Sequence, residues 1–267
     1  MNELAVRAMT GAVYVALTLG AAFAGPFTTL LLFLPVCVIA SGEMYDLVHG
    51  PGNASARAWS MIVGGVACLS VALGSFDADW TADYVAGLTC LVLIVSFVWL
   101  LLQGSNDPAR EVGGLLIVMF FVGLPFGSAV WFFAHGTWLF VGFMFMLWTN
   151  DTGAYLVGRT IGRTKLLPAV SPKKTVEGFV GGVLLTMGVA YLLSRYQPML
   201  SLGEWLGCGA IVGITSTLGD LLESALKRAR GVKDSGKILP GHGGMLDRFD
   251  GFLLAGPVLL IYLRLLH

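Results

Sequence analysis

VGGLLIVMFFVGLPFGSAVWFFA, at residues 112–134, is a continuous apolar stretch without a charged side chain. A helix needs about 20 such residues to cross the hydrocarbon core of a bilayer. Similar stretches recur along nearly the whole sequence, and charged residues make up 12% of it, against roughly 25% in a soluble domain. The pattern predicts an all-α fold, a polytopic bundle of membrane-spanning helices.

About nine transmembrane helices are predicted, separated by turn residues and polar stretches. Gly25-Pro26 is the least obvious break, because the sequence is apolar on both sides of it, and two spans fit residues 5–47 better than one. The first span is expected to be uncleaved, since further spans follow at once. The predicted spans are residues 5–24, 27–47, 59–75, 82–102, 112–134, 137–157, 176–194, 203–226 and 249–266.

The basic residues are distributed unequally between the two sides of such a bundle. With the N-terminus in the cytoplasm, all 16 Lys and Arg residues except Arg195 and Arg264 fall in cytoplasmic segments. Because basic residues are retained on that side, the sequence predicts an N-in, C-out orientation. Acidic residues also number 16, so the net charge is zero and no nucleic-acid partner is expected.

Unusual polar residues are concentrated in the second half of the chain. Residues 1–147 carry almost no conspicuous polar group within their spans and are interpreted as a membrane scaffold. Residues 148–267 combine the remaining spans with charged cytoplasmic loops, within one integral membrane unit.

Asp220 and Glu223 lie three residues apart on one predicted span, with Lys227 one turn further along the same face. Ionisable groups at membrane depth are costly and therefore indicate function. The alternative is that the span ends near Gly219 and leaves these groups in water.

The segment KRARGVKDSGKILPGHGGMLDRFDG, residues 227–251, places basic residues, aspartates and glycines between two spans. Asp247 and Asp250 lie three residues apart, so both carboxylates are expected on one side at the start of the last helix. Together with Asp220 they offer the oxygen ligands that Mg²⁺ takes. Glycines would let backbone N–H groups approach phosphate oxygens, so the segment predicts a site for a metal–polyphosphate complex.

A second basic loop contains SPKKTVEG at residues 171–178, where Thr175 is a candidate cap for the next helix. Lys173 and Lys174 are candidate ligands for an anionic group. The competing interpretation is that they only follow the positive-inside bias.

Two familiar motifs are rejected. Residues 231–237 fit G-x-x-x-x-G-K, but Ile238 follows where a P-loop requires Ser or Thr. His242 has no second His or Cys nearby for a zinc site, so phosphate binding or a role in the turn is expected of it.

Several stretches closely resemble the signature of bacterial phosphatidate cytidylyltransferases, also called CDP-diacylglycerol synthases. The strongest runs from SALKR through KDSGK to LPGHGGMLDRFD at residues 224–250. GDLLE at 219–223, SPKKTVEG at 171–178 and, more weakly, Asn150-Asp151 add to it. The resemblance implies a divalent-metal-dependent homodimer in the bacterial inner membrane, with its active site facing the cytoplasm.

The resemblance also implies a reaction, in which a phosphatidic acid oxygen attacks the α-phosphorus of CTP and expels pyrophosphate. Both substrates are anionic, so alignment and charge neutralisation should dominate. Mg²⁺ is expected on Asp220, Asp247 and Asp250, and the presence of a second cation stays open. The other residues assigned to catalysis or substrate binding are Lys227, Lys237, Arg228, Lys233, Asp234, His242 and Arg248, with Lys173 and Lys174 at the lipid phosphate.

Two other classes of protein were weighed. One is a related membrane CTP-dependent enzyme that acts on another lipid phosphate, such as an isoprenoid phosphate. The other is a transporter, whose site would lie near the membrane midplane on broken helices. The charges here gather at helix ends and loops, which favours an enzyme at the membrane surface.

Overall fold

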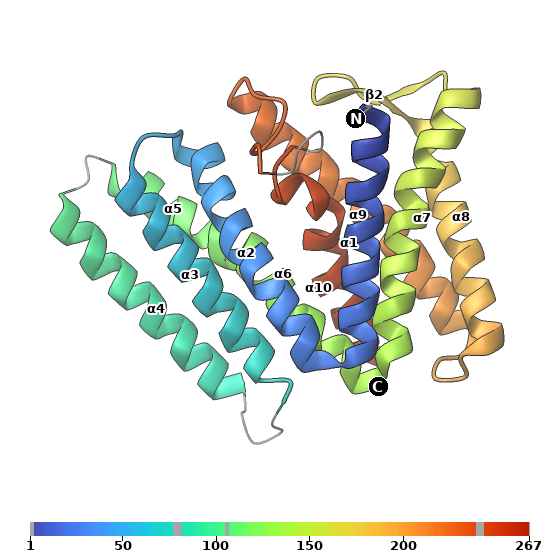
Figure 1. The fold of residues 1–267 in the computed structure, drawn as a ribbon, viewed down its shortest axis with the longest axis horizontal. Helices are drawn as coiled ribbons and strands as arrows, with labels where there is room; N and C mark the ends of the chain where they lie inside the picture. Colours follow the sequence, from blue (N-terminus) through green and yellow to red (C-terminus); the bar gives the residue numbers. More distant parts are fainter. Residues whose placement is uncertain (1–2, 77–81, 105–106, 239–242, 267) are drawn as a thin grey trace. The chain divides into compact units, whose positions relative to one another are not determined.

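The computed structural model describes residues 3–76, 82–104, 107–238 and 243–266, and helices dominate them (Figure 1). The chain folds as two compact units. The first consists of Met1–Ala134 and Asp234–Arg248, and the second of His135–Lys233 and Phe249–His267. This division is based on packing. The predicted division at residue 147 is based on where the unusual polar residues lie in the sequence, and it stays a prediction.

The first unit is built from successive helices. Gly25, with φ +119°, ends α1 and Pro26 begins α2, so the two helices predicted within residues 5–47 are confirmed. Asn53 and Asp107 cap α3 and α5 by accepting backbone N–H groups. The elements are α1 (Glu3–Ala24), α2 (Pro26–His49), α3 (Ala54–Leu73), α4 (Ala82–Gln103), α5 (Pro108–Ile117), the π-helix η1 (Val118–Gly123), α6 (Leu124–Ser128), the 3₁₀ helix η2 (Ala129–His135) and the 3₁₀ turn η3 (Leu246–Arg248).

The second unit contains four long helices and a hairpin. Its elements are α7 (Thr137–Ile161), β1 (Lys165–Leu167), β2 (Ser171–Thr175), α8 (Val176–Tyr196), α9 (Leu202–Ala229) and α10 (Asp250–Leu266). The strands pair antiparallel, with Lys165 opposite Thr175 and Leu167 opposite Ser171. Sequence analysis did not predict this hairpin.

Small residues let the helices of the second unit approach closely. A Cβ on Gly178 would lie 2.7 Å from the carbonyl oxygen of Ala154, so α7 and α8 pack backbone against backbone there. A Cβ on Gly213 would lie 2.9 Å from Cα of Val183, which brings α8 equally close to α9. This close packing is typical of membrane helices. It holds together α7, α8 and α9, which contribute residues to the cavity described below.

The structure confirms a helical membrane protein. Among the described residues, five helical segments are long and apolar enough to cross a bilayer: Pro26–His49, Ala54–Leu73, Pro108–His135, Val176–Tyr196 and Leu202–Ala229. Large apolar side chains face outward, such as Leu101 and Leu102 of α4, which are 79% and 82% exposed. In the described part of the chain, each of the nine predicted spans falls on a helical segment.

Candidate active site

A cavity of about 410 Å³ opens within the second unit. Its walls come from α7, the hairpin, the start of α8 and the middle of α9. It brings the predicted residues Lys173 and Lys174 together with Asp220, which lies more than 40 positions later in the sequence. The lining residues are Asn150, Asp151, Ala154, Tyr155, Gly158, Arg159, Leu166, Lys173, Lys174, Thr175, Gly178, Phe179, Thr217 and Asp220.

The hairpin positions the two lysines at this cavity. Thr175 ends β2 and caps α8, since its hydroxyl accepts the N–H of Gly178 at 3.1 Å, which confirms the predicted cap. Lys174, one residue earlier, forms an ion pair with Asp220 of α9. Both side chains are 28% exposed, so the pair is accessible from the cavity.

Asn150 of α7 also lines the cavity. It is 1% exposed, and its amide nitrogen donates to Oγ of Ser216 at 2.8 Å and to Oγ1 of Thr217 at 3.2 Å. These hydrogen bonds join α7 to α9 one turn before Asp220. The neighbouring Asp151 is exposed and lines the cavity.

The ionisable residues of α9 lie within the helix, because α9 continues to Ala229. The position along this helix at which the membrane span ends, near Gly219 or further on, stays a prediction. Ser224 donates to Oδ1 of Asp220 at 3.1 Å. Glu223 and Lys227 form an ion pair of 3.1 Å, with side chains 0% and 9% exposed, so the ammonium of Lys227 is directed to a carboxylate inside the unit.

Asp250 is the first residue of α10, which packs closely on α9. A Cβ on Gly219 would lie 2.5 Å from the carbonyl oxygen of Asp250. The carboxylates of Asp220, Glu223 and Asp151 all act electrostatically on Asp250. Four acidic side chains of the second unit therefore share one region, where a cation would relieve their repulsion.

The donor chemistry of this region suits Mg²⁺. Within the described ranges, no group of three His, Cys, Asp or Glu side chains could hold a metal by itself. Mg²⁺ usually needs only one or two carboxylates, and takes its other ligands from water and substrate phosphates. Asp220 and Asp250 are carboxylates of this kind, and Mg²⁺ binding by them stays a prediction.

Asp247 differs from its predicted placement. It lies in η3 of the first unit and not in the last helix, which begins at Asp250. Its Oδ2 accepts three donors: N of Ser235 at 2.9 Å, Oγ of Ser235 at 3.0 Å and N of Gly244 at 2.8 Å. This oxygen stabilises the loop, and the predicted role of Asp247 as a metal ligand stays a prediction.

The remaining predicted residues are mostly exposed. Arg228 follows Lys227 on α9 and donates to the carbonyl oxygen of Val232 at 2.7 Å, which closes the turn after the helix. His242 lies outside the described residues. Lys173, Arg228, Lys233, Asp234, Lys237 and Arg248 are exposed.

Comparison with known proteins covers nearly the whole chain. The model of the cytidylyltransferase family matches residues 5–266. The chain belongs to this family. A phosphatidate cytidylyltransferase of Staphylococcus haemolyticus is 32% identical, over 97% of this chain and 98% of the relative. Another of Bacillus subtilis is 36% identical over 71% of each.

Sequence analysis missed two polar residues in this member of the cytidylyltransferase family. Glu43 of α2 is 3% exposed and contacts the loop that contains Asp247. The hydroxyl oxygen of Ser235 in that loop lies 3.0 Å from an oxygen of each of the carboxylates Glu43 and Asp247. Glu43 and Asp46 are carboxylates within the predicted span 27–47, and this was the available signal, since such residues are expensive in a membrane. The description of residues 1–147 as bare scaffold needs this correction.

Proposed function

We propose that this chain transfers CMP from CTP to phosphatidic acid, giving CDP-diacylglycerol and pyrophosphate for phospholipid biosynthesis. The observation that carries the proposal is the relationship over nearly full length to phosphatidate cytidylyltransferases. The cavity supports it, because cations (Lys173, Lys174, Arg159) and carboxylates (Asp151, Asp220) line one space. Binding a metal–phosphate complex requires both.

The reaction forms one bond and breaks one bond. An oxygen of the phosphatidate phosphate attacks the α-phosphorus of CTP, and the bond from that phosphorus to the bridging oxygen of the β-phosphate breaks. The electron pair leaves with pyrophosphate. No general base is needed, since the second pKa of a phosphate monoester is about 6 and the attacking oxygen is already largely ionised.

The residues of the chain supply alignment and charge. Lys173 and Lys174 hold the lipid phosphate, while Arg228, Lys233, Lys237 and Arg248 neutralise the triphosphate. Lys227 keeps Glu223 paired on the same helix. Mg²⁺, when bound to Asp220 and Asp250, would neutralise phosphate charge and stabilise the leaving group. Asp247 as a third ligand, Asp234 and His242 at the nucleotide, and a second cation remain parts of the proposal.

We further propose nine spans, with the N-terminus in the cytoplasm, the C-terminus outside and the active site facing the cytoplasm. The positions of the basic residues support this orientation, since only Arg195 and Arg264 would lie outside. Besides the five segments named above, α1, α4, α7 and α10 complete a bundle suited to the inner membrane. The active form is a homodimer.

Purified protein in detergent tests the activity. CTP and phosphatidic acid together should release pyrophosphate and yield CDP-diacylglycerol, and chelating divalent cations should abolish both products. The same assay with an isoprenoid phosphate tests the second substrate class. Turnover of the isoprenoid phosphate without turnover of phosphatidic acid would replace the proposed lipid substrate.

A further inference from the structure

Glu43 is an acidic residue inside an apolar helix. It lies in α2, where its neighbours Gly42 and Met44 are buried, and is itself 3% exposed. A buried carboxylate is strongly destabilising unless hydrogen bonds or opposite charges compensate the loss of hydration. The partners of Glu43 therefore explain why an acidic residue is tolerated here.

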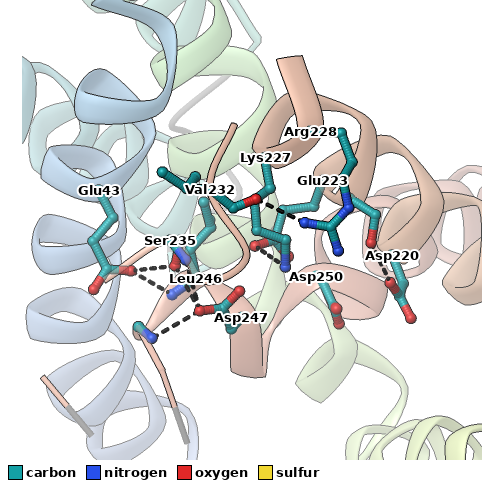
Figure 2. A network of polar contacts seen from close by, with 12 residues as sticks. Glu43, Asp220, Glu223, Lys227, Arg228, Val232, Ser235, Leu246, Asp247 and Asp250 are labelled. Atoms are coloured by element: carbon teal, nitrogen blue, oxygen red, sulfur yellow. Dashed lines mark hydrogen bonds and ion pairs between the residues drawn. The ribbon is translucent and has the colours of Figure 1, made fainter. Parts of the chain in front are cut away.

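Within the described residues, Glu43 is hydrogen-bonded to residues of the segments 234–238 and 243–248, here called the glycine loop. Oε1 accepts the N–H of Met245 at 3.0 Å, and Oε2 accepts the N–H of Leu246 at 2.8 Å. Oε2 also accepts the hydroxyl of Ser235 at 3.0 Å. Figure 2 shows Glu43 extending from its helix toward Ser235 and Leu246. These partners are 192 to 203 positions away in the sequence, so Glu43 binds a distant loop and not its own helix.

Glycines of the loop make room for this carboxylate. A Cβ on Gly236 would collide with Oε1 of Glu43, and a Cβ on Gly244 would lie 2.5 Å from Oε2. Gly243 has φ +83°, and its Cβ would lie 2.6 Å from Oδ2 of Asp247. Sequence analysis assigned the glycines to contact with phosphate. At these three positions, contact with a protein carboxylate already requires glycine.

Two carboxylates thus hold the loop from different elements. Asp247 holds Ser235 and Gly244 within the loop, and Glu43 fastens the loop to α2. The hydroxyl of Ser235 lies 3.0 Å from an oxygen of each carboxylate and has one proton to donate, so it couples the two.

We propose that Glu43 is a positioning residue for CMP transfer, acting through the glycine loop on Lys237 and Arg248. This inference rests on the proposed function. Lys237 follows Gly236, which packs on Glu43, and Arg248 is two residues after Leu246, which Glu43 binds. Both cations are exposed. A fixed backbone presents them to a triphosphate with less freedom to lose on binding.

Glu43→Gln tests the proposal without changing side-chain volume. The amide oxygen of the new side chain can still accept hydrogen bonds from Leu246 and Ser235. Its NH₂ group then faces the N–H of Met245, and two donors cannot form a hydrogen bond with each other. We expect kcat/KM for CTP to fall by roughly 10- to 10²-fold, as misplacement by about 1 Å can cause. The KM for phosphatidic acid should change less than the KM for CTP. Ser41→Ala is the matched control, because Ser41 is buried on the same helix and donates to the carbonyl oxygen of Cys37 within that helix.

Hydrogen exchange at the amides of Gly244, Met245 and Leu246 reports the loop independently of turnover. It should quicken in Glu43→Gln and stay unchanged in Ser41→Ala. Ser235→Ala provides a second route if Glu43→Gln folds poorly. It should raise the KM for CTP and the loop exchange more mildly, and the effects of the two changes should not add when combined, because both weaken the same attachment of the loop to residue 43.

Normal CTP kinetics in Glu43→Gln would overturn the positioning role, and so would equal changes in the KM values of both substrates. Unchanged hydrogen exchange at the loop amides would contradict the attachment of the glycine loop to α2 by Glu43. If the unaltered protein showed no CTP-dependent turnover while Glu43→Gln still quickened hydrogen exchange in the loop, the proposed function would be wrong. The attachment of the glycine loop by Glu43 would still be supported.

Discussion

Asp220 contacts residues from two kinds of element. Lys174 of the hairpin forms an ion pair with it, and Ser224 of its own helix donates to it. Its side chain is 28% exposed at the cavity, so solvent and ligands reach it. Because Asp250 lies in the same acidic region, the two carboxylates should bind one cation together.

Asp220→Asn and Asp250→Asn should each lower kcat/KM by at least roughly 10²-fold. Asn keeps the size of Asp but removes a ligand charge, metal ions supply several kcal/mol to such transition states, and 1.36 kcal/mol is tenfold. The double variant should be little worse than either single one, since both changes disable the same ion. Turnover across a Mg²⁺ titration measures this. Thr215→Ala, a change on α9 outside the cavity lining, should keep normal turnover, whereas fully multiplicative losses would rule out a shared site.

Lys174→Ala should raise the KM for phosphatidic acid more than the KM for CTP, and Lys237→Ala should do the reverse. The physical reason is that Lys174 lines the cavity next to Asp220, whereas Lys237 belongs to the glycine loop. Steady-state kinetics with each substrate varied in turn provides the measurement. Equal changes in both KM values for either variant would contradict its assignment.

Single residues were predictable where charge made them conspicuous. Lys173, Lys174 and Asp220 were identified from local motifs, yet their meeting at one cavity depends on packing between α7, α8 and α9. Glu43 was overlooked, because its hydrogen-bonding partners lie some 200 positions later and no local spacing indicates them.

The junction between the hairpin and α8 sets the geometry of one cavity wall. Glu177, in the first turn of α8, accepts the N–H groups of Arg163 and Thr164 at 3.1 Å each, which ties the segment between α7 and β1 to the start of α8. Thr175 is 6% exposed, caps α8 and lines the cavity. A single side chain thus stabilises a helix and shapes the site.

Thr175→Ala and Ser201→Ala form a matched pair for this element. Each removes a helix N-cap, from α8 and α9 respectively, and should cost about 1 kcal/mol of stability. Only Thr175→Ala should also lower turnover, because Ser201 does not line the cavity. Thermal unfolding in detergent and steady-state kinetics check the two effects. Thr175→Ser should restore both, and equal turnover in the two Ala variants would contradict a role for the junction in the site.

Helices were predictable at this scale because long apolar stretches specify them. The hairpin was not, because its strands of 3 and 5 residues are polar and include Pro172. The shift to π and 3₁₀ geometry between Val118 and His135 was also missed, since hydropathy is the same in each helix type.

At the scale of the whole molecule, membrane topology follows from the basic residues. A reporter fused at the C-terminus should appear outside, and one inserted in the hairpin turn at residues 168–170 should appear in the cytoplasm. The reason is that basic residues are retained inside, and those around the hairpin include Arg159, Arg163 and Lys165. Accessibility to a membrane-impermeant label is the measurement. Finding both reporters on one side would contradict nine spans.

Hydropathy and the charge distribution predicted the class of fold, because both depend only on the order of residues along the chain. They could not predict the two packing units, in which residues 234–248 join the first 134 residues. That assignment depends on contacts such as Glu43 with Leu246, which form only in three dimensions.

The central claim is that the chain transfers CMP, and the fate of labelled phosphorus tests it most directly. Purified protein should be incubated with phosphatidic acid and with CTP labelled at either the α- or the γ-phosphorus. The α label should enter the lipid product, and the γ label should be released as pyrophosphate. Transfer of the γ label to lipid, or no labelled lipid with either nucleotide, would contradict it.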